Sequence, residues 1–204
     1  MFERKPRILI ADNTPLSVLS LLGSEGLDWL FVPGADVWVT DMVKEEAVRD
    51  PAPSSDQRIG QRTILATWFA DNADRIHEHP TVEGEEYRKA MANWRDAGSK
   101  PETKPSWANR GDRSILEVMG VIDDLVQEGE AIVAIMDDRK VRAALEVMKL
   151  DMDMMSTETF IIWMSETFGI KQADTAWQTI KSIMGDSVPT LRADDDEPVS
   201  TFKV

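Results

Sequence analysis

Six acidic residues stand where the sequence predicts that strands end or helices begin, and their carboxylates are its strongest chemical candidates. Asp12 follows the apolar run 7–11, and a second pair follows the continuous apolar run 131–136. In an open parallel sheet, ligands bind beside the carboxyl ends of the strands, so we expect these acids to share one crevice. The six residues are Asp12, Glu45, Glu46, Asp112, Asp137 and Asp138.

Carboxylates gathered at one edge predict a divalent-cation site. Such groups repel one another, and burial raises their pKa, so they are tolerated together when cations neutralise them. Mg²⁺ and Mn²⁺ are hard cations that prefer oxygen ligands. Two such ions about 3.5–4 Å apart can hold a phosphodiester, activate a water and stabilise the leaving oxygen. The pattern therefore predicts a site for Mg²⁺ or Mn²⁺, and chemistry on a phosphodiester is one use of such a site.

Each acid also has a purely structural interpretation. Asp12, Asp112 and the pair Asp137-Asp138 could cap the helices that follow them. Glu45 and Glu46 could lie on the surface of their helix. These structural interpretations do not explain why all the acids should lie at one edge of the sheet, because independent helix caps need not share an edge.

The elements that would position these acids follow an α/β pattern. The sequence predicts strands at 7–11, 37–39, 131–136 and 152–155, and helices at 15–22, 41–48, 112–126, 139–149, 157–168 and 173–184. The run 131–136 is apolar throughout, as expected for a strand buried on both faces of a parallel sheet. We therefore expect a single α/β domain over residues 1–204.

Two segments stand apart from this pattern. Residues 56–106 read as a helical insertion with two amphipathic helices, and we expect Trp68 and Phe69 to belong to a core. His77 and His79 do not share a helix face, so a metal site there has little support. Residues 190–204 form an acidic tail that we interpret as solvated surface, ending in an edge strand or in disorder.

The composition narrows the classes of function. The chain has 204 residues, 42% hydrophobic and 29% charged, which is typical of a globular protein. It has no cysteine, so disulfides and thiolate chemistry are excluded, and we expect a cytoplasmic location. The sequence enters its first strand directly, and we expect no signal peptide and no membrane association. A net charge of −14 argues against a general nucleic-acid-coating protein but suits a carboxylate metal site.

The motifs around the acids resemble the PIN-domain family of metal-dependent ribonucleases, which includes VapC-type toxins. The resemblance covers residues 7–50 and 107–185. It rests on five segments: Ile10-Ala11-Asp12-Asn13-Thr14-Pro15-Leu16, Gly26-Leu27-Asp28-Trp29-Leu30, Val39-Thr40-Asp41-Met42-Val43-Lys44-Glu45-Glu46, Gly111-Asp112-Arg113-Ser114-Ile115, and Ile135-Met136-Asp137-Asp138-Arg139-Lys140-Val141-Arg142.

The resemblance implies a three-layer α/β/α sandwich around a central parallel sheet, PIN-like, with a helical insertion. It implies a Mg²⁺- or Mn²⁺-dependent endoribonuclease, a hydrolase whose partners are RNA and, in a toxin–antitoxin pair, an antitoxin; a homodimer is left open. The implied catalytic residues are Asp12, Glu46, Asp112 and Asp138, the implied metal ligands are Asp12, Asp112, Asp138 and Asp137, and the supporting or alternate residues are Glu45, Asn13, Thr14 and Thr157.

Two other classes of protein are compatible with parts of the pattern. A PIN-like protein kept for interaction, with a weak or inactive site, would carry the same fold. A phospho-receiver domain would use Asp12 and Asp41, but Asn13 replaces its second adjacent acid and no later strand-Lys-Pro signature follows. An Asp-x-Asp phosphatase lacks its second Asp, because position 14 is Thr.

Overall fold

The central element of the fold is a five-stranded parallel sheet with strand order β3-β2-β1-β4-β5. The computed structural model describes residues 4–49, 59–148 and 150–185. The strands are β1 (Lys5–Ala11), β2 (Asp36–Thr40), β3 (Ile76–His79), β4 (Glu130–Ile135) and β5 (Met152–Met155). The predicted α/β class with a parallel sheet is confirmed.

The sheet brings its carboxyl ends to one edge, as a parallel arrangement requires. Ala11 of β1 pairs with Ile135 of β4, and Ile135 pairs in turn with Met155 of β5. Residues 131–135 of β4 are fully buried, which explains their unbroken apolar sequence. The residues that follow β1, β2, β4 and β5 therefore begin at the same side of the molecule.

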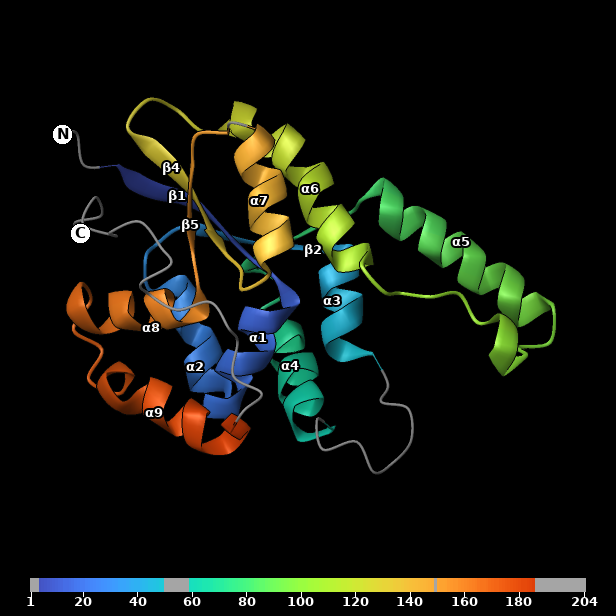
Figure 1. Cartoon of the computed structure of the whole chain (residues 1–204), viewed down its shortest axis with the longest axis horizontal. Helices are drawn as coiled ribbons and strands as arrows, with labels where there is room; N and C mark the ends of the chain where they lie inside the picture. Colours follow the sequence, from blue (N-terminus) through green and yellow to red (C-terminus); the bar gives the residue numbers. More distant parts are fainter. Residues whose placement is uncertain (1–3, 50–58, 149, 186–204) are drawn as a thin grey trace.

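Helices cover both faces of the sheet and make the expected three-layer α/β/α sandwich (Figure 1). On one face α6 contacts α7, and on the other α1 contacts α2, α4 and α8, while α3 contacts both α1 and α6. The helices are α1 (Asn13–Leu19), α2 (Ser24–Asp28), α3 (Asp41–Val48), α4 (Ile59–Asp71), α5 (Val82–Asp96), α6 (Arg110–Ile122), α7 (Arg139–Met148), α8 (Thr157–Glu166) and α9 (Ala173–Met184). Short 3₁₀ turns lie at 20–22, 29–31, 101–103 and 123–125, and those at 20–22 and 123–125 replace the ends of two predicted helices.

The segment expected to be a helical insertion also supplies a strand. Its helix α4 places Leu65, Trp68 and Phe69 in the main core, as expected for those aromatic residues. β3 then pairs with β2 at the edge of the sheet, a strand that the sequence prediction missed. Its residues Ile76–His79 are exposed or only partly buried, so they lack the apolar run that marks the inner strands.

α5 is the part of this segment that leaves the body of the protein. It extends outward, and the chain returns from its far end to α6 (Figure 1). We call α5 and this return, residues 82–109, the arm. A small separate core of Met42, Tyr87 and Met91 joins the arm to α3, with Trp94 and Trp107 packed against it. The predicted acidic tail at 190–204 lies outside the described residues, and no described helix is long and apolar enough to cross a membrane.

Candidate metal centre

Asp12 stands at the end of β1 with its carboxyl group buried. Its backbone N–H donates to the carbonyl of Ile135, 3.1 Å away, so the β1–β4 pairing continues to this residue. Its side chain precedes α1 but makes no capping hydrogen bond. The capping interpretation therefore does not explain this acid, which is only 6% exposed.

The surroundings of Asp12 favour its neutral form. Burial is the largest influence and, together with the negative charges of Asp112 and Glu46, raises the pKa of Asp12 to about 7. The nearby backbone N–H groups of Asn13 and Thr14 act in the opposite direction and lower that pKa. Asn13 and Thr14 thus support the acid through their backbone, and three carboxyl groups share one electrostatic environment.

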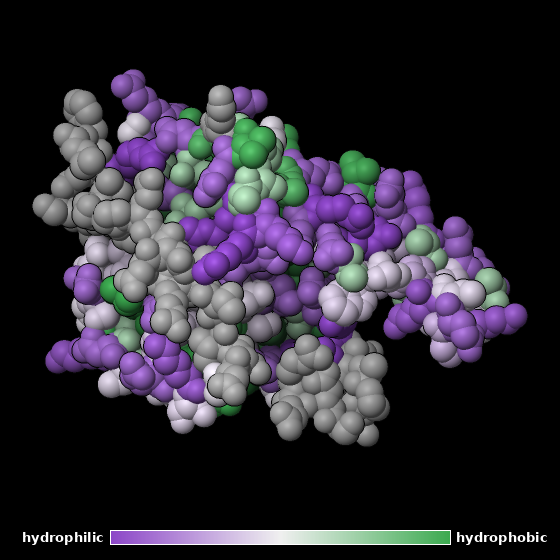
Figure 2. Space-filling view, viewed as in Figure 1, coloured by the Kyte–Doolittle hydropathy of each residue, from purple (hydrophilic) through white to green (hydrophobic). Residues whose placement is uncertain are grey.

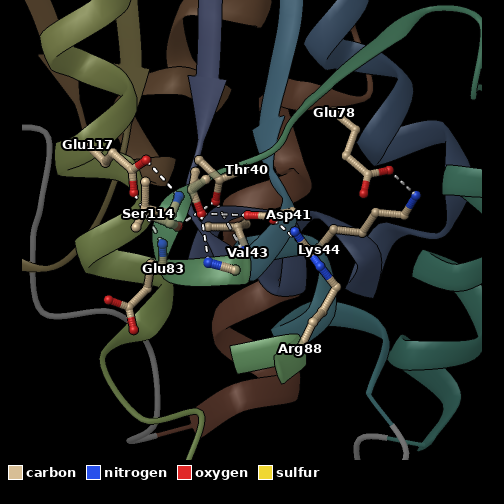
Figure 3. A network of polar contacts seen from close by, with 12 residues as sticks. Thr40, Asp41, Val43, Lys44, Glu78, Glu83, Arg88, Ser114 and Glu117 are labelled. Carbon is tan, nitrogen blue, oxygen red and sulfur yellow. Dashed lines mark hydrogen bonds and ion pairs between the residues drawn. The ribbon is translucent and has the colours of Figure 1, made fainter. Parts of the chain in front are cut away.

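Glu46 reaches this environment because α3 is fixed against the start of α6. Thr40 caps α3 by accepting the N–H of Val43 at 3.1 Å. The Ser114 hydroxyl donates to the Gly111 carbonyl at 2.6 Å, so the Thr40 hydroxyl donates to Ser114, also at 2.6 Å (Figure 3). This chain of buried hydrogen bonds ties the end of β2 to the first turn of α6.

The side chain of Glu46 lies directly against that first turn. A Cβ placed on Gly111 would come within 2.9 Å of Glu46 Oε2, so a larger residue there would displace this carboxylate from its present position. Burial is the main cause that raises the pKa of Glu46, with a further contribution from Asp112; Arg49 and a hydrogen bond from the Asn13 side chain lower it. Asn13 is therefore a direct partner of Glu46.

Glu45, the alternate at this position, faces elsewhere. It is exposed, and its charge adds to the effect of burial, the larger cause, in raising the pKa of Tyr87 on the arm. Consecutive helical residues point about 100° apart, so only one of the two glutamates can face α6. The structure brings Glu46 to the other acids and leaves Glu45 outside.

Asp112 and Asp138 complete the set. Burial first, and then the negative charge of Asp138, raise the pKa of Asp112 in the first turn of α6. Asp138 is exposed, and its Oδ1 accepts the N–H groups of Lys140 at 2.6 Å and Val141 at 3.3 Å at the start of α7. Asp138 is thus a helix cap, as the structural interpretation proposed, and also a neighbour of Asp112.

Asp137 is turned the other way and has a different role. Its Oδ1 accepts the backbone N–H of Thr157 at 2.9 Å, and its Oδ2 accepts the Thr157 hydroxyl at 2.5 Å. Both residues are buried, Asp137 at 7% and Thr157 at 0% exposure. Asp137 therefore joins the end of β4 to the start of α8, and the arrangement favours Asp138 as the acid that faces Asp112.

A further buried acid, Asp41, fixes the arm. Its Oδ1 accepts the Thr81 hydroxyl at 2.7 Å and its Oδ2 accepts Arg88 at 2.6 Å (Figure 3). A Cβ on Gly84 would come within 2.0 Å of Asp41 Oδ2, so glycine is required there. The sequence signal was the position of Asp41 directly after a strand. Both its oxygens are engaged, which leaves no open acceptor of the receiver type.

The donor set suits a hard divalent cation. Across the described ranges, no three His, Cys, Asp or Glu side chains converge closely enough to enclose a metal ion. Mg²⁺, however, retains several waters and is usually bound by one or two carboxylates together with substrate phosphates. Buried Asp12, beside two other acids, provides oxygen ligands and excess negative charge for such a site.

Comparison with known proteins assigns no family. No protein-family model matches the chain, and no curated protein matches it.

Proposed function

We propose that this protein is a Mg²⁺- or Mn²⁺-dependent endoribonuclease that hydrolyses RNA phosphodiester bonds, with a PIN-like site. The observation that carries the proposal is the coupling of buried Asp12, whose pKa is raised to about 7, with Glu46 and Asp112. In a protein that binds no cation, the repulsion among these three carboxyl groups would only destabilise the fold. A divalent cation would relieve it and would bring phosphate oxygens to the same edge.

The acids of the candidate site would have different roles in this reaction. Asp12, the buried acid, and Asp112 in the first turn of α6 would hold the ion, and Asp138 would face it from the start of α7. Glu46, held against Gly111 and bonded by Asn13, would orient the attacking water. When bound, the cation supplies Lewis-acid stabilisation of the phosphodiester and of the leaving oxygen.

The titration of Asp12 gives this proposal a pH dependence. A proton and a cation compete for the same carboxylate, so binding strengthens as the pH rises through about 7. A phospho-receiver function has no comparable support, because Asp41 is held by Thr81 and Arg88. A protein kept only for interaction would show neither cation binding nor cleavage.

The experiment is RNA cleavage by the purified full chain with Mn²⁺, with Mg²⁺ and with EDTA. Wild type should cleave a single-stranded RNA only with a divalent cation. Asp12→Asn and Asp112→Asn should each lower the rate by about 100-fold or more, the range seen when a key electrostatic group is lost. Glu45→Gln, which removes the neighbouring exposed acid, is the matched control for Glu46→Gln and should retain activity. Cleavage by Asp12→Asn at the wild-type rate would refute the proposal.

A further inference from the structure

The outer part of the arm is basic in a protein that is otherwise strongly acidic. Its acids Glu83, Glu85 and Glu86 lie in the first turn and a half of α5, next to the body. Residues 87–109, the rest of the arm, contain five Lys and Arg against two Asp and Glu, a net charge of +3, whereas the whole chain carries −14. Phosphate groups are therefore repelled by most of the chain and attracted to this segment.

Part of that positive charge is not neutralised by the protein. Arg88 pairs with Asp41, Lys89 with Glu85, and Arg110 with Glu83. Three exposed cations at the outer end of the arm have no ion pair with any described acid: Arg95, Lys100 and Lys104. They are available to a ligand that carries several negative charges.

Three aromatic rings of the arm each contact a cation, and one of these cations is Lys104. Tyr87, Trp94 and Trp107 each have a cation over the ring: Arg110 at 5.4 Å, Lys104 at 5.7 Å and Arg49 at 3.1 Å from the respective centroids. Trp94 and Trp107 are half-buried, so part of each indole is accessible. Aromatic and guanidinium planes among positive charges are the features that bind unpaired bases and their phosphates.

This surface is continuous with the acid cluster. Arg49 stacks on Trp107 and also lowers the pKa of Glu46 by its charge. Arg110, over the ring of Tyr87, immediately precedes Gly111 and Asp112. Arg49 and Arg110 therefore connect the aromatic rings of the arm with the neighbourhood of the carboxylates, and the acids Glu45 and Glu83 lie beside Tyr87 and Arg110. Figure 2 shows that the arm stands clear of the body, with a mostly hydrophilic surface.

The arm is held in place from two sides of the fold. Asp41 binds Thr81 and Arg88 from the start of α3, and Glu117 of α6 accepts the N–H groups of Val82 at 2.7 Å and Glu83 at 3.3 Å (Figure 3). A surface fixed in this way can set the position of a bound strand relative to Asp112.

We propose that the arm binds single-stranded RNA, with its phosphates on Arg95, Lys100 and Lys104 and its bases against Trp94 and Trp107. The proposal rests on the proposed nuclease function and deepens it, because it names the strand form that the site accepts. Stacking requires unpaired bases, and the bases of a duplex are already stacked on one another.

The test is equilibrium binding of a fluorescent, unstructured RNA to the full chain in EDTA at several KCl concentrations. The triple variant Arg95→Glu, Lys100→Glu, Lys104→Glu should bind at least about tenfold more weakly, and its salt dependence should fall by about two units of slope, since each contact to a single strand contributes about 0.7. Trp94→Leu, which keeps an apolar side chain in the small core, should bind at least about fivefold more weakly without a change of slope.

A comparison triple variant carries the same charge change away from the arm: Lys5→Glu, Lys171→Glu and Lys181→Glu, all exposed, of which Lys181 pairs with Glu158 at 3.6 Å. It should bind within about twofold of wild type at moderate salt, where charges more than about 10 Å away are screened. Equal losses in the two triple variants, tighter binding of duplex than of single strand, or no RNA binding by wild type would overturn the proposal. The proposal would also be overturned if the arm variants lost binding to a protein partner but bound RNA as wild type does.

Cleavage separates the two proposals. A wild-type protein that binds RNA through the arm but never cleaves it would refute the nuclease function and support the arm. Cleavage by the arm variant at unchanged KM would refute the role of the arm and leave the nuclease function standing.

Discussion

Glu46 lies so close to Gly111 that a Cβ on that residue would come within 2.9 Å of Glu46 Oε2. The two residues belong to different helices, α3 and α6, which the Thr40–Ser114 hydrogen bond holds together at 2.6 Å. The position of this carboxylate is therefore determined by the packing of two helices and the absence of one methyl group.

Gly111→Ala should displace Glu46 while the fold is retained. The added methyl group must push away only the carboxylate end of the flexible Glu46 side chain, so the free energy of unfolding should change by less than about 1 kcal/mol, the size of the helix-propensity gain of alanine over glycine. Denaturant unfolding should show this small change, and RNA cleavage should fall about as far as in Glu46→Gln. Gly120→Ala in the same helix meets no atom within 4 Å and is the control. Full activity in Gly111→Ala would show that Glu46 takes no part.

The free energy of unfolding should depend on pH through Asp12. Its pKa is about 7 in the folded protein against 3.8 ordinarily. Between these values the unfolded chain has lost the proton and the folded chain has kept it, so stability falls as pH rises, by at most about 4 kcal/mol. Asp12→Asn should be more stable than wild type at pH 8 without metal, and its stability should change less with pH. Denaturation curves with the same pH dependence in both proteins would contradict the raised pKa.

The sheet was predictable because its inner strands are buried on both faces, and such strands are continuous apolar runs. β4 is the clearest case, with residues 131–135 fully buried. β3 could not be predicted in the same way, because Ile76–His79 form an exposed edge strand. Its register beside β2 is visible only in the folded sheet.

The acids at the sheet edge followed from topology, but their individual orientations did not. Asp137 and Asp138 are adjacent in sequence, yet one is turned toward Thr157 and the other caps α7. The packing of α3 against α6 decides whether Glu45 or Glu46 faces inward. Helical periodicity alone does not show which side of α3 is buried. These choices require tertiary contacts with residues far away in the chain.

Asp137 and Asp138 should respond differently to substitution. Asp137→Ala would leave the Thr157 N–H and hydroxyl without their buried partner, at a cost of about 1–3 kcal/mol with or without Mn²⁺. Asp138→Asn preserves the α7 cap, because Asn caps as well as Asp, so it should keep its stability in EDTA and lose part of the Mn²⁺-dependent increase in Tm. Thermal unfolding with and without Mn²⁺ distinguishes the two. If Asp138→Asn lost stability in EDTA and Asp137→Ala lost only the Mn²⁺-dependent increase in Tm, Asp137 would be the metal ligand and Asp138 the structural residue.

The toxin interpretation predicts an effect on living cells. Induced expression of the full chain without any partner should stop bacterial growth, because uncontrolled RNA hydrolysis removes essential transcripts. Asp12→Asn and Asp112→Asn should restore growth at equal soluble amounts, and Glu45→Gln should not. Normal growth with abundant, folded wild-type protein would refute toxicity and leave the nuclease proposal to the cleavage assay.

The most direct test of the central claim is the anomalous diffraction of crystals soaked in Mn²⁺ above the Asp12 pKa of about 7. We expect an anomalous peak at the carboxyl edge of the sheet, with Asp12 and at least one of Asp112 and Asp138 about 2.2 Å from the ion, a distance typical of oxygen ligands of small divalent cations. The absence of a peak there, with these side chains remaining apart, would contradict a metal site at this edge.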